Sequence, residues 1–478
     1  MNYRAGLPAA NSTKSYWLRE PNELKDIQTS EQLQDCDVVI IGAGITGVSC
    51  AYHLNELSPT SNITILEARG ICEGATGRNG GHLTPNTYRG FTKNAQRFKL
   101  ERWTSKLKFE FECASAIRSL IATEKWEEQV ELTSDGNLHV FFSESEAKEA
   151  QQELKTMQEC GLYGGDFFDA DLATEMLGTR KTFGGVFNSL AGHFWPAKLV
   201  YLMARKIIAL GVQVHANTPV IELQPIKPSA SSSDEPRWTV TTPRGTIRCK
   251  SVIHCTNGYV SSLVPSLTNR VIPVRGQVIA AEPPASVIIP PFPFGLSANR
   301  GCEYAVWRRD NVVVLGGGRE VTAPNFEIGK TDDNEINEKI SKRLRAFLRD
   351  RLSGPEPCIE EWTVLNEWTG IMGYTEDALP WVGPLGEEGQ FVSVGFHGHG
   401  MPVAFHCAKA VAQQVLGQSV SVPGFTDIFL PSRKVAIPGA QQRAEAERAA
   451  KLGPEETGVS ELAGSGTPKK DKAAHSRL

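Results

Sequence analysis

Long apolar stretches are missing from this sequence, and so is a strong net charge. No segment approaches the roughly 18 consecutive apolar residues that a membrane helix needs, and the first 36 residues lack the basic and then apolar order of a signal peptide. The 50 basic and 54 acidic residues leave a net charge of −4, which provides no basic surface for nucleic acid or anionic membranes. We therefore expect a soluble, non-secreted protein with a small-molecule substrate and without a nucleic-acid or membrane partner.

Paired cysteines are also missing. The ten cysteines are spread singly along the 478 residues, with no CxxC pair and no metal-ligand spacing. This pattern predicts reduced thiols in an intracellular compartment and no metal site. A chain of this length is long enough for two or three domains with a large buried core.

A strand, a tight turn and a helix are predicted near the start of the chain. The apolar residues over 37–41 end at Gly42, and apolar residues at helical spacing follow from Ile45. Gly42 allows the turn, Gly44 lets the backbone approach a diphosphate, and Gly47 lets the helix pack closely on the strand. The helix N-terminus favours an anion, so this stretch predicts a dinucleotide-binding unit.

An acidic residue and a glycine-rich loop follow this unit. Glu67 closes the second predicted strand, where a carboxylate accepts hydrogen bonds from both ribose hydroxyls of an adenosine and repels a 2'-phosphate. Residues 74–82 are dense in glycine. Such density indicates backbone that lies against a flat or anionic ligand, and a flexible surface loop is the alternative.

The segment from Glu67 through Gly74-Ala-Thr-Gly-Arg-Asn-Gly-Gly-His82 resembles the flavin-binding start of the D-amino-acid-oxidase-like (DAO) family of FAD-dependent amine oxidases. The resemblance covers about residues 37–430 and implies FAD as the cofactor. It also implies an α/β fold, in which a Rossmann-like FAD-binding domain is joined to a second α+β substrate domain built on an antiparallel sheet. The expected parts are an N-terminal extension (1–36), a discontinuous FAD-binding domain (37–90, 191–265 and 371–430), a substrate domain (91–190 and 266–370) and a disordered tail (431–478).

The motif and the resemblance together imply a set of cofactor contacts in both glycine-rich stretches, at one strand end and in a later turn. They are Gly42, Gly44, Ile45, Thr46, Gly47, Glu67, Ala68, Arg69, Thr76, Gly77, Arg78, Asn79, Gly80, Gly81, His82, Val220, Thr256, Asn257, Gly258, Gly398, His399, Gly400 and Met401. For residues 256–258 a plain strand-ending turn stays an alternative. Arg275, Tyr304 and Trp307 fit either a pocket wall or ordinary sheet packing.

The later turn follows a predicted strand at 391–394 and precedes a predicted helix with Pro402 in its first turn. Residues 395–401 match the family's Gly-x-x-Gly-His-Gly-Met turn. Backbone N–H groups at a helix start stabilise the negative charge that a flavin gains with a hydride. His82, Met372 and His399 are pocket candidates for catalysis. For His399, a loop histidine held by backbone hydrogen bonds is the first interpretation, ahead of a role in proton transfer.

Two departures from the family narrow the substrate. Met372 stands where glycine and D-amino-acid oxidases have a carboxylate-binding arginine, and Pro402 stands where sarcosine oxidases have a lysine. Because methionine cannot replace a bidentate arginine, the pattern favours the gamma-glutamylputrescine-oxidase-like branch and an amine without an α-carboxylate. No cysteine occurs over 366–384, where sarcosine-type enzymes attach the flavin, which implies non-covalent FAD.

The sequence therefore predicts an FAD-dependent oxidase of a small primary or secondary amine. Hydride passes to flavin N5, molecular oxygen is reduced to hydrogen peroxide, and the imine hydrolyses. A dehydrogenase of amines or amino acids with another electron acceptor stays open, because no lysine occurs over 303–307, where oxygen-using members of the family often have one near the flavin. A non-catalytic flavin-binding assembly protein stays open as well.

The chain ends in Ser476-Arg477-Leu478 after a segment poor in large apolar residues, which predicts disorder. This tripeptide resembles the Ser-Lys-Leu peroxisomal address. We therefore expect a peroxisomal import receptor as a partner and a peroxisomal location, with the cytoplasm as the alternative.

Overall fold

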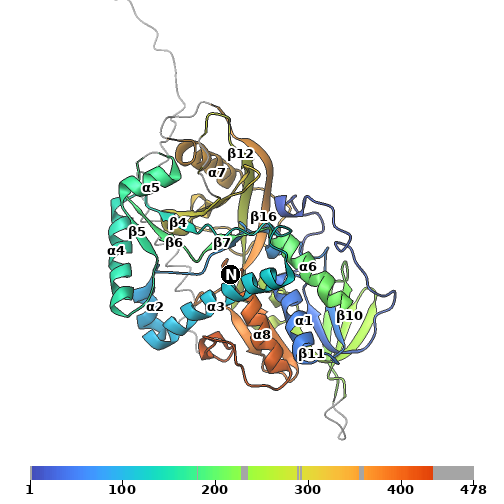
Figure 1. The fold of residues 1–478 in the computed structure, drawn as a ribbon. Coiled ribbons are helices and arrows are strands. Elements are labelled where there is room, and N and C mark those ends of the chain that lie inside the picture. Colours follow the sequence, from blue (N-terminus) through green and yellow to red (C-terminus); the bar gives the residue numbers. More distant parts are fainter. Residues whose placement is uncertain are drawn as a thin grey trace, which may run out of the picture.

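The structure is a computed structural model that describes residues 3–179, 181–227, 235–287, 290, 293–354 and 360–433. In it the chain forms two large sheets with helices packed around them (Figure 1). From residue 434 onward the predicted tail lies outside the described residues, and so does its terminal tripeptide of residues 476–478.

The first sheet has the strand order β17-β18-β11-β1-β2-β8. Its neighbours run parallel from β18 to β8, β17 is antiparallel at the edge, and β9 and β10 extend one half of β11 as an antiparallel meander. The strands are β1 (Cys36–Ile41), β2 (Ile63–Leu66), β8 (Gln213–His215), β9 (Glu222–Pro225), β10 (Trp238–Thr242), β11 (Gly245–His254), β17 (Trp381–Pro384) and β18 (Gln390–Val394). Parallel neighbours joined by helices make this the predicted Rossmann-like sheet.

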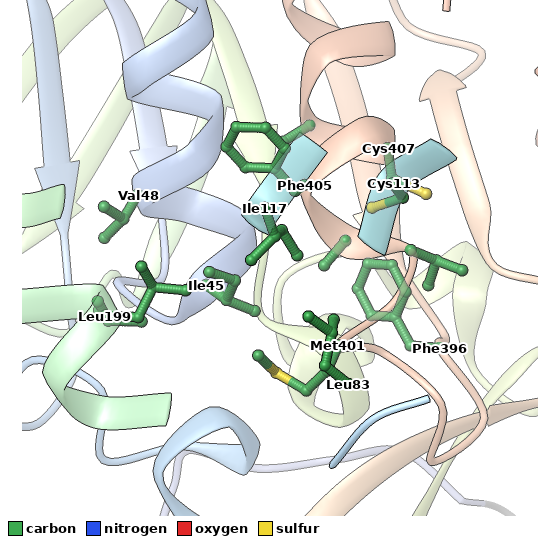
Figure 2. Packing of buried hydrophobic residues seen from close by; sticks show 14 of the residues in the cluster. Ile45, Val48, Leu83, Cys113, Ile117, Leu199, Phe396, Met401, Phe405 and Cys407 are labelled. Carbon is green, nitrogen blue, oxygen red and sulfur yellow. The ribbon is translucent and has the colours of Figure 1, made fainter. Parts of the chain in front are cut away.

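Three helices cover the first sheet, and α1 packs against both of the others. Figure 2 shows the apolar layer between them, with Ile45 and Val48 on α1, Leu199 on α6 and Phe405 on α8. Burying each such side chain contributes roughly 1.5–3 kcal/mol. The helices are α1 (Ile45–Leu57), α6 (Pro196–Ala209) and α8 (Ala404–Val415). Pro196 occupies the first turn of α6, as its fixed φ favours.

The second sheet has the strand order β16-β12-β15-β14-β13-β4-β6-β5. All of its neighbours are antiparallel except β13 and β4. The strands are β4 (Asn137–Val140), β5 (Asp166–Phe168), β6 (Gly185–Asn188), β12 (Val271–Glu282), β13 (Gly295–Ala298), β14 (Glu303–Trp307), β15 (Val313–Gly317) and β16 (Thr363–Thr375). The predicted fold class, a Rossmann-like domain with an α+β partner, is confirmed.

The helices other than α1, α6 and α8 are grouped with the second sheet (Figure 1). They are α2 (Phe91–Phe98), α3 (Leu100–Glu124), α4 (Glu144–Glu159), α5 (Ala170–Leu177) and α7 (Glu338–Arg351). An amphipathic pattern runs through residues 92–123, but the structure divides this segment into two helices. Lys99 has a φ of 72°, and this positive-φ residue separates α2 from α3.

The β16–β12 edge of the second sheet lies next to the first sheet. These two strands pair along their full length, from Val271 opposite Thr375 to Glu282 opposite Thr363. The short helix that follows β11 packs against both strands, so the carboxyl end of the first sheet faces the second. The 3-10 helices are η1 (Tyr16–Leu18), η2 (Ala75–Arg78), η3 (Asn257–Ser262), η4 (Pro265–Leu267), η5 (Asn299–Gly301), η6 (Arg319–Thr322) and η7 (Asp427–Phe429), and a small two-stranded sheet joins β3 (His82–Leu83) to β7 (Gly192–His193). The domain bounds given above stay a prediction.

The N-terminal segment is anchored by η1. Tyr16 and Trp17 are buried, and the ring of Tyr16 stacks on Trp195 with the centroids 5.5 Å apart. Trp17 Nε1 donates to the carbonyl oxygen of Asn79 at 2.6 Å. Within the described residues, no helix combines the length and the apolar composition that crossing a membrane requires.

Candidate active site

One large cavity, of about 950 Å³, lies between the two sheets. Its wall begins at the turn after β1. Gly42 has a φ of 108°, and a Cβ on Gly47 would stand 1.8 Å from the carbonyl oxygen of Gly42, so α1 can approach β1 only with glycine there. Gly44 is the N-cap of α1 and forms no side-chain cap hydrogen bond. The first-turn N–H groups of α1 therefore point toward the cavity end that Gly44 lines, as an anion site requires.

Glu67 lies beside this helix start. Its Oε2 accepts a hydrogen bond from Ala43 N at 2.8 Å, and its Oε1 accepts one from Arg69 N at 3.0 Å. Burial raises the pKa of the carboxyl, and the two N–H groups oppose that rise. Each oxygen keeps a lone pair, so the carboxylate fits the two ribose hydroxyls that the sequence assigned to it.

The glycine-rich loop folds over the cavity as η2. Thr76 Oγ1 accepts from Ile45 N at 3.1 Å, which ties the loop to the start of α1. Arg69 and Arg78 share the fully buried carboxylate of Asp333, at 3.0 and 3.5 Å. Most of the remaining donors of Arg78 go to backbone carbonyls of the loop, of the N-terminal segment and of β16. Both arginines line the cavity, and in the structure their charges hold the loop in place.

The loop's later glycines make room for aromatic rings. A Cβ on Gly80 would stand 2.6 Å from the ring of Tyr304, and one on Gly81 would stand 2.8 Å from Trp17. Asn79 Oδ1 accepts from Gly81 N at 2.8 Å. Tyr304 thus reaches the cavity wall, which settles the open choice for that residue.

The other two residues of that choice are structural. Arg275 is buried, and its Nε donates to Glu327 Oε2 at 2.6 Å. Trp307 lies in the apolar cluster of the second sheet. Neither lines the cavity.

The end of β11 connects the two glycine-rich stretches. Asn257 Oδ1 accepts from Gly395 N at 2.9 Å, which joins the end of β11 to the end of β18. Gly258 packs on the backbone of Met372, where a Cβ would meet the carbonyl oxygen at 2.6 Å. Thr256 Oγ1 is buried and finds no hydrogen-bond partner in the described part of the chain, so this hydroxyl is available to a ligand in the cavity.

The turn at 395–401 places its backbone at the cavity. His399 N donates to Phe396 O at 2.8 Å, and Ala404 N donates to Gly400 O at 2.8 Å. The helix begins at Ala404, so the prediction that Pro402 occupies its first turn is wrong. Pro402 lies in the preceding turn, because Gly400 O accepts from both Val403 N and Ala404 N and closes that turn first.

A charged network behind His399 was missed in the sequence. His399 Nε2 lies 3.1 Å from Glu110 Oε2, and Glu110 also pairs with Lys106 and accepts from Asn86 N at 2.6 Å. Glu110 is fully buried. Burial opposes its ionisation, but Lys106 and His399 outweigh burial and hold the pKa of the carboxyl well below its usual range. Lys106 and Glu110 are one helical turn apart on α3, and that spacing was the only signal in the sequence.

His82 lies on β3, opposite His193. Its ring meets Tyr304 edge-on, with the centroids 5.8 Å apart. Burial, together with the positive charge that His193 and His399 can carry, lowers the pKa of His82 to about 3. The imidazole is therefore neutral at physiological pH, and it can exchange hydrogen bonds without carrying a charge.

Nearly all of the predicted site residues converge on this cavity. Four of them do not line it and instead shape the backbone beside it: Gly47, Gly77, Gly81 and Gly258. The remaining predicted residues line it: Gly42, Gly44, Ile45, Thr46, Glu67, Ala68, Arg69, Thr76, Arg78, Asn79, Gly80, His82, Val220, Thr256, Asn257, Met372, Gly398, His399, Gly400 and Met401. Leu7 and Pro8 of the N-terminal segment also reach it, which no pattern in that segment indicated.

The start of α1 at Gly44, the free lone pairs of Glu67 and the orphan hydroxyl of Thr256 fit a nucleotide cofactor that lies along this cavity. In the described residues, no group of three or more histidine, cysteine or acidic side chains is placed to hold a metal ion. Every described cysteine is a free thiol, as predicted. The fold and the cavity together define a protein that binds a nucleotide cofactor between two sheets.

The chain belongs to the FAD dependent oxidoreductase (DAO) family, whose model matches residues 37–414. It is similar to gamma-glutamylputrescine oxidoreductase of Escherichia coli, with 24% identity over 89% of this chain and 95% of that protein. It is also similar to a probable oxidoreductase, OrdL, of Rhizobium meliloti, with 23% identity over 84% of this chain and 87% of that protein. The chain is thus an FAD-dependent oxidoreductase of this family.

Solved structures agree on the fold. The crystal structure of glycine oxidase from Geobacillus kaustophilus superposes with a TM-score of 0.67 at 18% identity, and the match covers 84% of this chain and all of that one. The L-amino acid deaminase of Proteus myxofaciens gives 0.67 at 15% identity, over 91% and 100%. At these identities the likeness concerns the fold alone.

The predicted peroxisomal location is wrong. The E. coli and Rhizobium relatives span most of this chain and come from bacteria, which have no peroxisomes. A terminal Ser-Arg-Leu is short enough to arise by chance, and the structure does not describe these residues. The cytoplasmic alternative stays a prediction.

Proposed function

We propose that this chain oxidises a small primary or secondary amine that carries no α-carboxylate. FAD, held non-covalently in the cavity, would supply the hydride acceptor for this oxidation, with oxygen reduced to hydrogen peroxide and the imine hydrolysed after release. The observation that carries the proposal is Met372. Its side chain lines the cavity from β16, with its sulfur 3.1 Å from where a Cβ on Gly398 would stand. A thioether beside the glycine turn provides apolar surface at the place where a carboxylate needs a cation.

For this oxidation the protein needs only to position the amine and to stabilise the negative charge that develops. Bound FAD supplies the hydride-accepting flavin. The chain holds the amine against that flavin, and the backbone of residues 398–401 provides N–H groups where negative charge develops. The E. coli relative is named for an acylated diamine, which supports an amine rather than an amino acid as the first substrate class to test.

One cation favours the amino-acid alternative. Arg319 lines the cavity, and its Nη2 donates to Tyr374 Oη at 2.7 Å, two residues along β16 from Met372. If an amino acid is the substrate, Arg319 is the group placed to bind its carboxylate. Arg319→Met would then raise KM for amino acids at least 100-fold and leave simple amines unaffected.

Lys106 supports oxygen as the electron acceptor. It lines the cavity from α3, and its Nζ stands 4.7 Å from the ring centre of Trp103. Superoxide, the first product of one-electron oxygen reduction, is an anion, and a buried ammonium group lowers its energy. Lys106 therefore provides a cavity lysine although none occurs over 303–307.

The cysteines support non-covalent FAD. Cys255 and Cys302 line the cavity. Burial raises the pKa of the Cys302 thiol to about 12 and that of Cys255 well above its usual value. Both therefore stay thiols, which are poor nucleophiles toward a flavin ring. Acid precipitation of the yellow protein should leave the flavin in the supernatant.

Anaerobic flavin bleaching tests the proposal. The purified holoenzyme is mixed without oxygen with polyamines, acylated polyamines, N-methyl amines and amino acids, and air is then readmitted while peroxide is measured. Bleaching by amines, rapid reoxidation and stoichiometric peroxide are expected. Strong bleaching by ordinary α-amino acids would overturn the interpretation of Met372. Bleaching without rapid reoxidation leaves a dehydrogenase, and no bleaching by any compound leaves a non-catalytic flavoprotein.

A further inference from the structure

Two buried polar atoms at the cavity wall, one on β4 of the second sheet and one on β3, have no hydrogen-bond partner among the described residues. Asn137 on β4 is 4% exposed, and its Nδ2 donates to Ser297 Oγ on β13 at 3.4 Å. Its Oδ1 is buried and accepts no hydrogen bond from any described residue. The same holds for Nε2 of His82. Both residues line the cavity, and because buried polar atoms are normally hydrogen bonded, the two orphans indicate a ligand.

The two side chains face a shared space that a glycine leaves open. Gly295 on β13 pairs with Asn137 on β4. A Cβ on Gly295 would stand 2.7 Å from Asn137 Oδ1 and 3.3 Å from both Cε1 and Nδ1 of His82. Tyr304 holds the imidazole from the other side by its edge-on contact. The amide oxygen and the imidazole are therefore neighbours at one place on the wall.

This place carries no charge of its own. Asn137 is neutral, and His82 stays neutral because its pKa lies at about 3. The ionisable groups nearest to His82 are His193 across the β3–β7 pair, Tyr304, and His399 with its partner Glu110. The next inward position on β4 is His139, which lies 3.1 Å from Glu146 and is compensated by it. No unpaired carboxylate among the described residues faces the two acceptors.

We infer that Asn137 Oδ1 and the imidazole of His82 bind the reacting nitrogen of the substrate as a neutral amine, by accepting its N–H groups. This inference rests on the proposed function. The substrate class is a primary or secondary amine, since a tertiary amine has no N–H to donate.

The oxidation explains why neutral acceptors suit this position. The C–H bond next to nitrogen breaks, two electrons and the hydrogen leave together as hydride to the oxidised flavin of FAD, and the nitrogen lone pair forms the C=N bond. An ammonium group has no lone pair for that step. A carboxylate at this place would stabilise the ammonium form, whereas an amide oxygen and a neutral imidazole bind N–H with much less bias toward the charged form.

The pH dependence of anaerobic flavin reduction tests the role of Asn137. Asn137→Ala should lower kcat/KM for the best primary amine about 10- to 100-fold, the effect of one lost hydrogen bond in a dry site. Asn137→Asp should move the acid limb of the pH profile of the limiting rate of anaerobic flavin reduction upward by about one pH unit or more, because the new carboxylate favours the ammonium form of the bound amine. An acid limb that stays in place in Asn137→Asp would overturn the inference, as would a tertiary amine reduced as fast as its secondary analogue.

Asn188 provides a matched control. It pairs with Asn137 across β4 and β6, but its Nδ2 donates to Pro85 O at 3.3 Å and its Oδ1 accepts from Leu190 N at 3.1 Å. Asn188→Asp should lower the melting temperature and leave the acid limb where the wild-type enzyme has it. A shift of the limb in this variant equal to that in Asn137→Asp would assign the effect to general charge and overturn the inference.

A binding measurement separates this inference from the proposed function. tert-Butylamine has no hydrogen on the carbon next to nitrogen, so it can bind but cannot be oxidised. Its titration into the holoenzyme, followed by the visible flavin spectrum, should give a Kd that rises at least 10-fold in Asn137→Ala and in Gly295→Ala, whose methyl group fills the shared space. Asn137-dependent binding without oxidation of any amine would refute the proposed function alone. Amine turnover with a Kd unchanged in both variants would refute this inference alone.

Discussion

Alanine substitutions at three glycines should separate the packing role of the nucleotide motif from its cofactor role. At Gly47 a Cβ would stand 1.8 Å from Gly42 O, whereas ordinary contact is 3.4–4 Å. Helix α1 would have to move away from β1 by roughly 1.5 Å, and such overpacking costs about 1–3 kcal/mol or more. We expect the upper end, about 3 kcal/mol, because both atoms in the contact belong to the backbone and no rotamer relieves it.

Gly44 differs because its neighbour is a side chain. A Cβ there would stand 2.9 Å from Thr76 Oγ1, and rotation of that hydroxyl relieves the contact at the cost of the bond from Ile45 N, about 1 kcal/mol. The added methyl group stands at the start of α1, where the diphosphate would approach. Gly44→Ala should therefore weaken FAD binding about 10- to 100-fold, or about 1.4–2.7 kcal/mol, and lower apoprotein stability only slightly.

Gly386, between β17 and β18, is the control, since a Cβ there has nothing within 4 Å, its φ is not in the left-handed range, and it does not line the cavity. Urea unfolding of the three apoproteins and titration with FAD, followed by flavin fluorescence, measure the two effects separately. Gly47→Ala should lose stability, Gly44→Ala should lose affinity, and Gly386→Ala should lose neither. Wild-type FAD affinity in Gly44→Ala, or wild-type stability in Gly47→Ala, would refute the division of roles.

Three further predictions concern buried ionisable side chains. Lys106→Met should slow reoxidation of the reduced enzyme by oxygen about 10- to 100-fold without changing anaerobic reduction, as measured by stopped flow. The double variant Lys106→Met/Glu110→Gln, which removes both buried charges, should be reoxidised as slowly. Reoxidation at the wild-type rate in both variants would show that Lys106 has no role in that step. Asp333→Asn leaves the guanidinium groups that it pairs with uncompensated, so the unfolding free energy should fall by about 3–5 kcal/mol, and a loss below about 1 kcal/mol in urea would contradict the assignment. Burial lowers the pKa of His254 to about 4, below the value of about 6.5 in the unfolded chain. The unfolded state therefore binds the extra proton, and stability should fall as the pH drops from about 6.5 to 4. In His254→Gln the slope of unfolding free energy against pH should decrease by about one proton, about 1.4 kcal/mol per pH unit, and an unchanged slope would show that His254 is protonated in the fold.

Short-range patterns predicted the parts of this protein whose structure depends on neighbours in sequence. The strand, turn and helix around Gly42 follow from local periodicity and from glycine's freedom at positive φ. The turn at 395–401 and the helix after it were found in the same way.

Patterns failed where a distant contact or a single backbone angle decides the outcome. The positive φ of Lys99 breaks one amphipathic pattern into α2 and α3, and no residue type at that position signals it. Within the unbroken strand β11, the change of partner from β10 to β1 likewise depends on tertiary structure.

The sequence by itself predicted a dinucleotide site beside Gly42, because three glycines, a helix start and Glu67 lie within one continuous unit. It also determined the place of Met372 through the resemblance of its motif. Only the tertiary structure brought Asn137 beside His82 and Glu110 beside His399. Each of these pairs joins segments far apart in the chain, and their proximity depends on how the two sheets and α3 pack around the cavity.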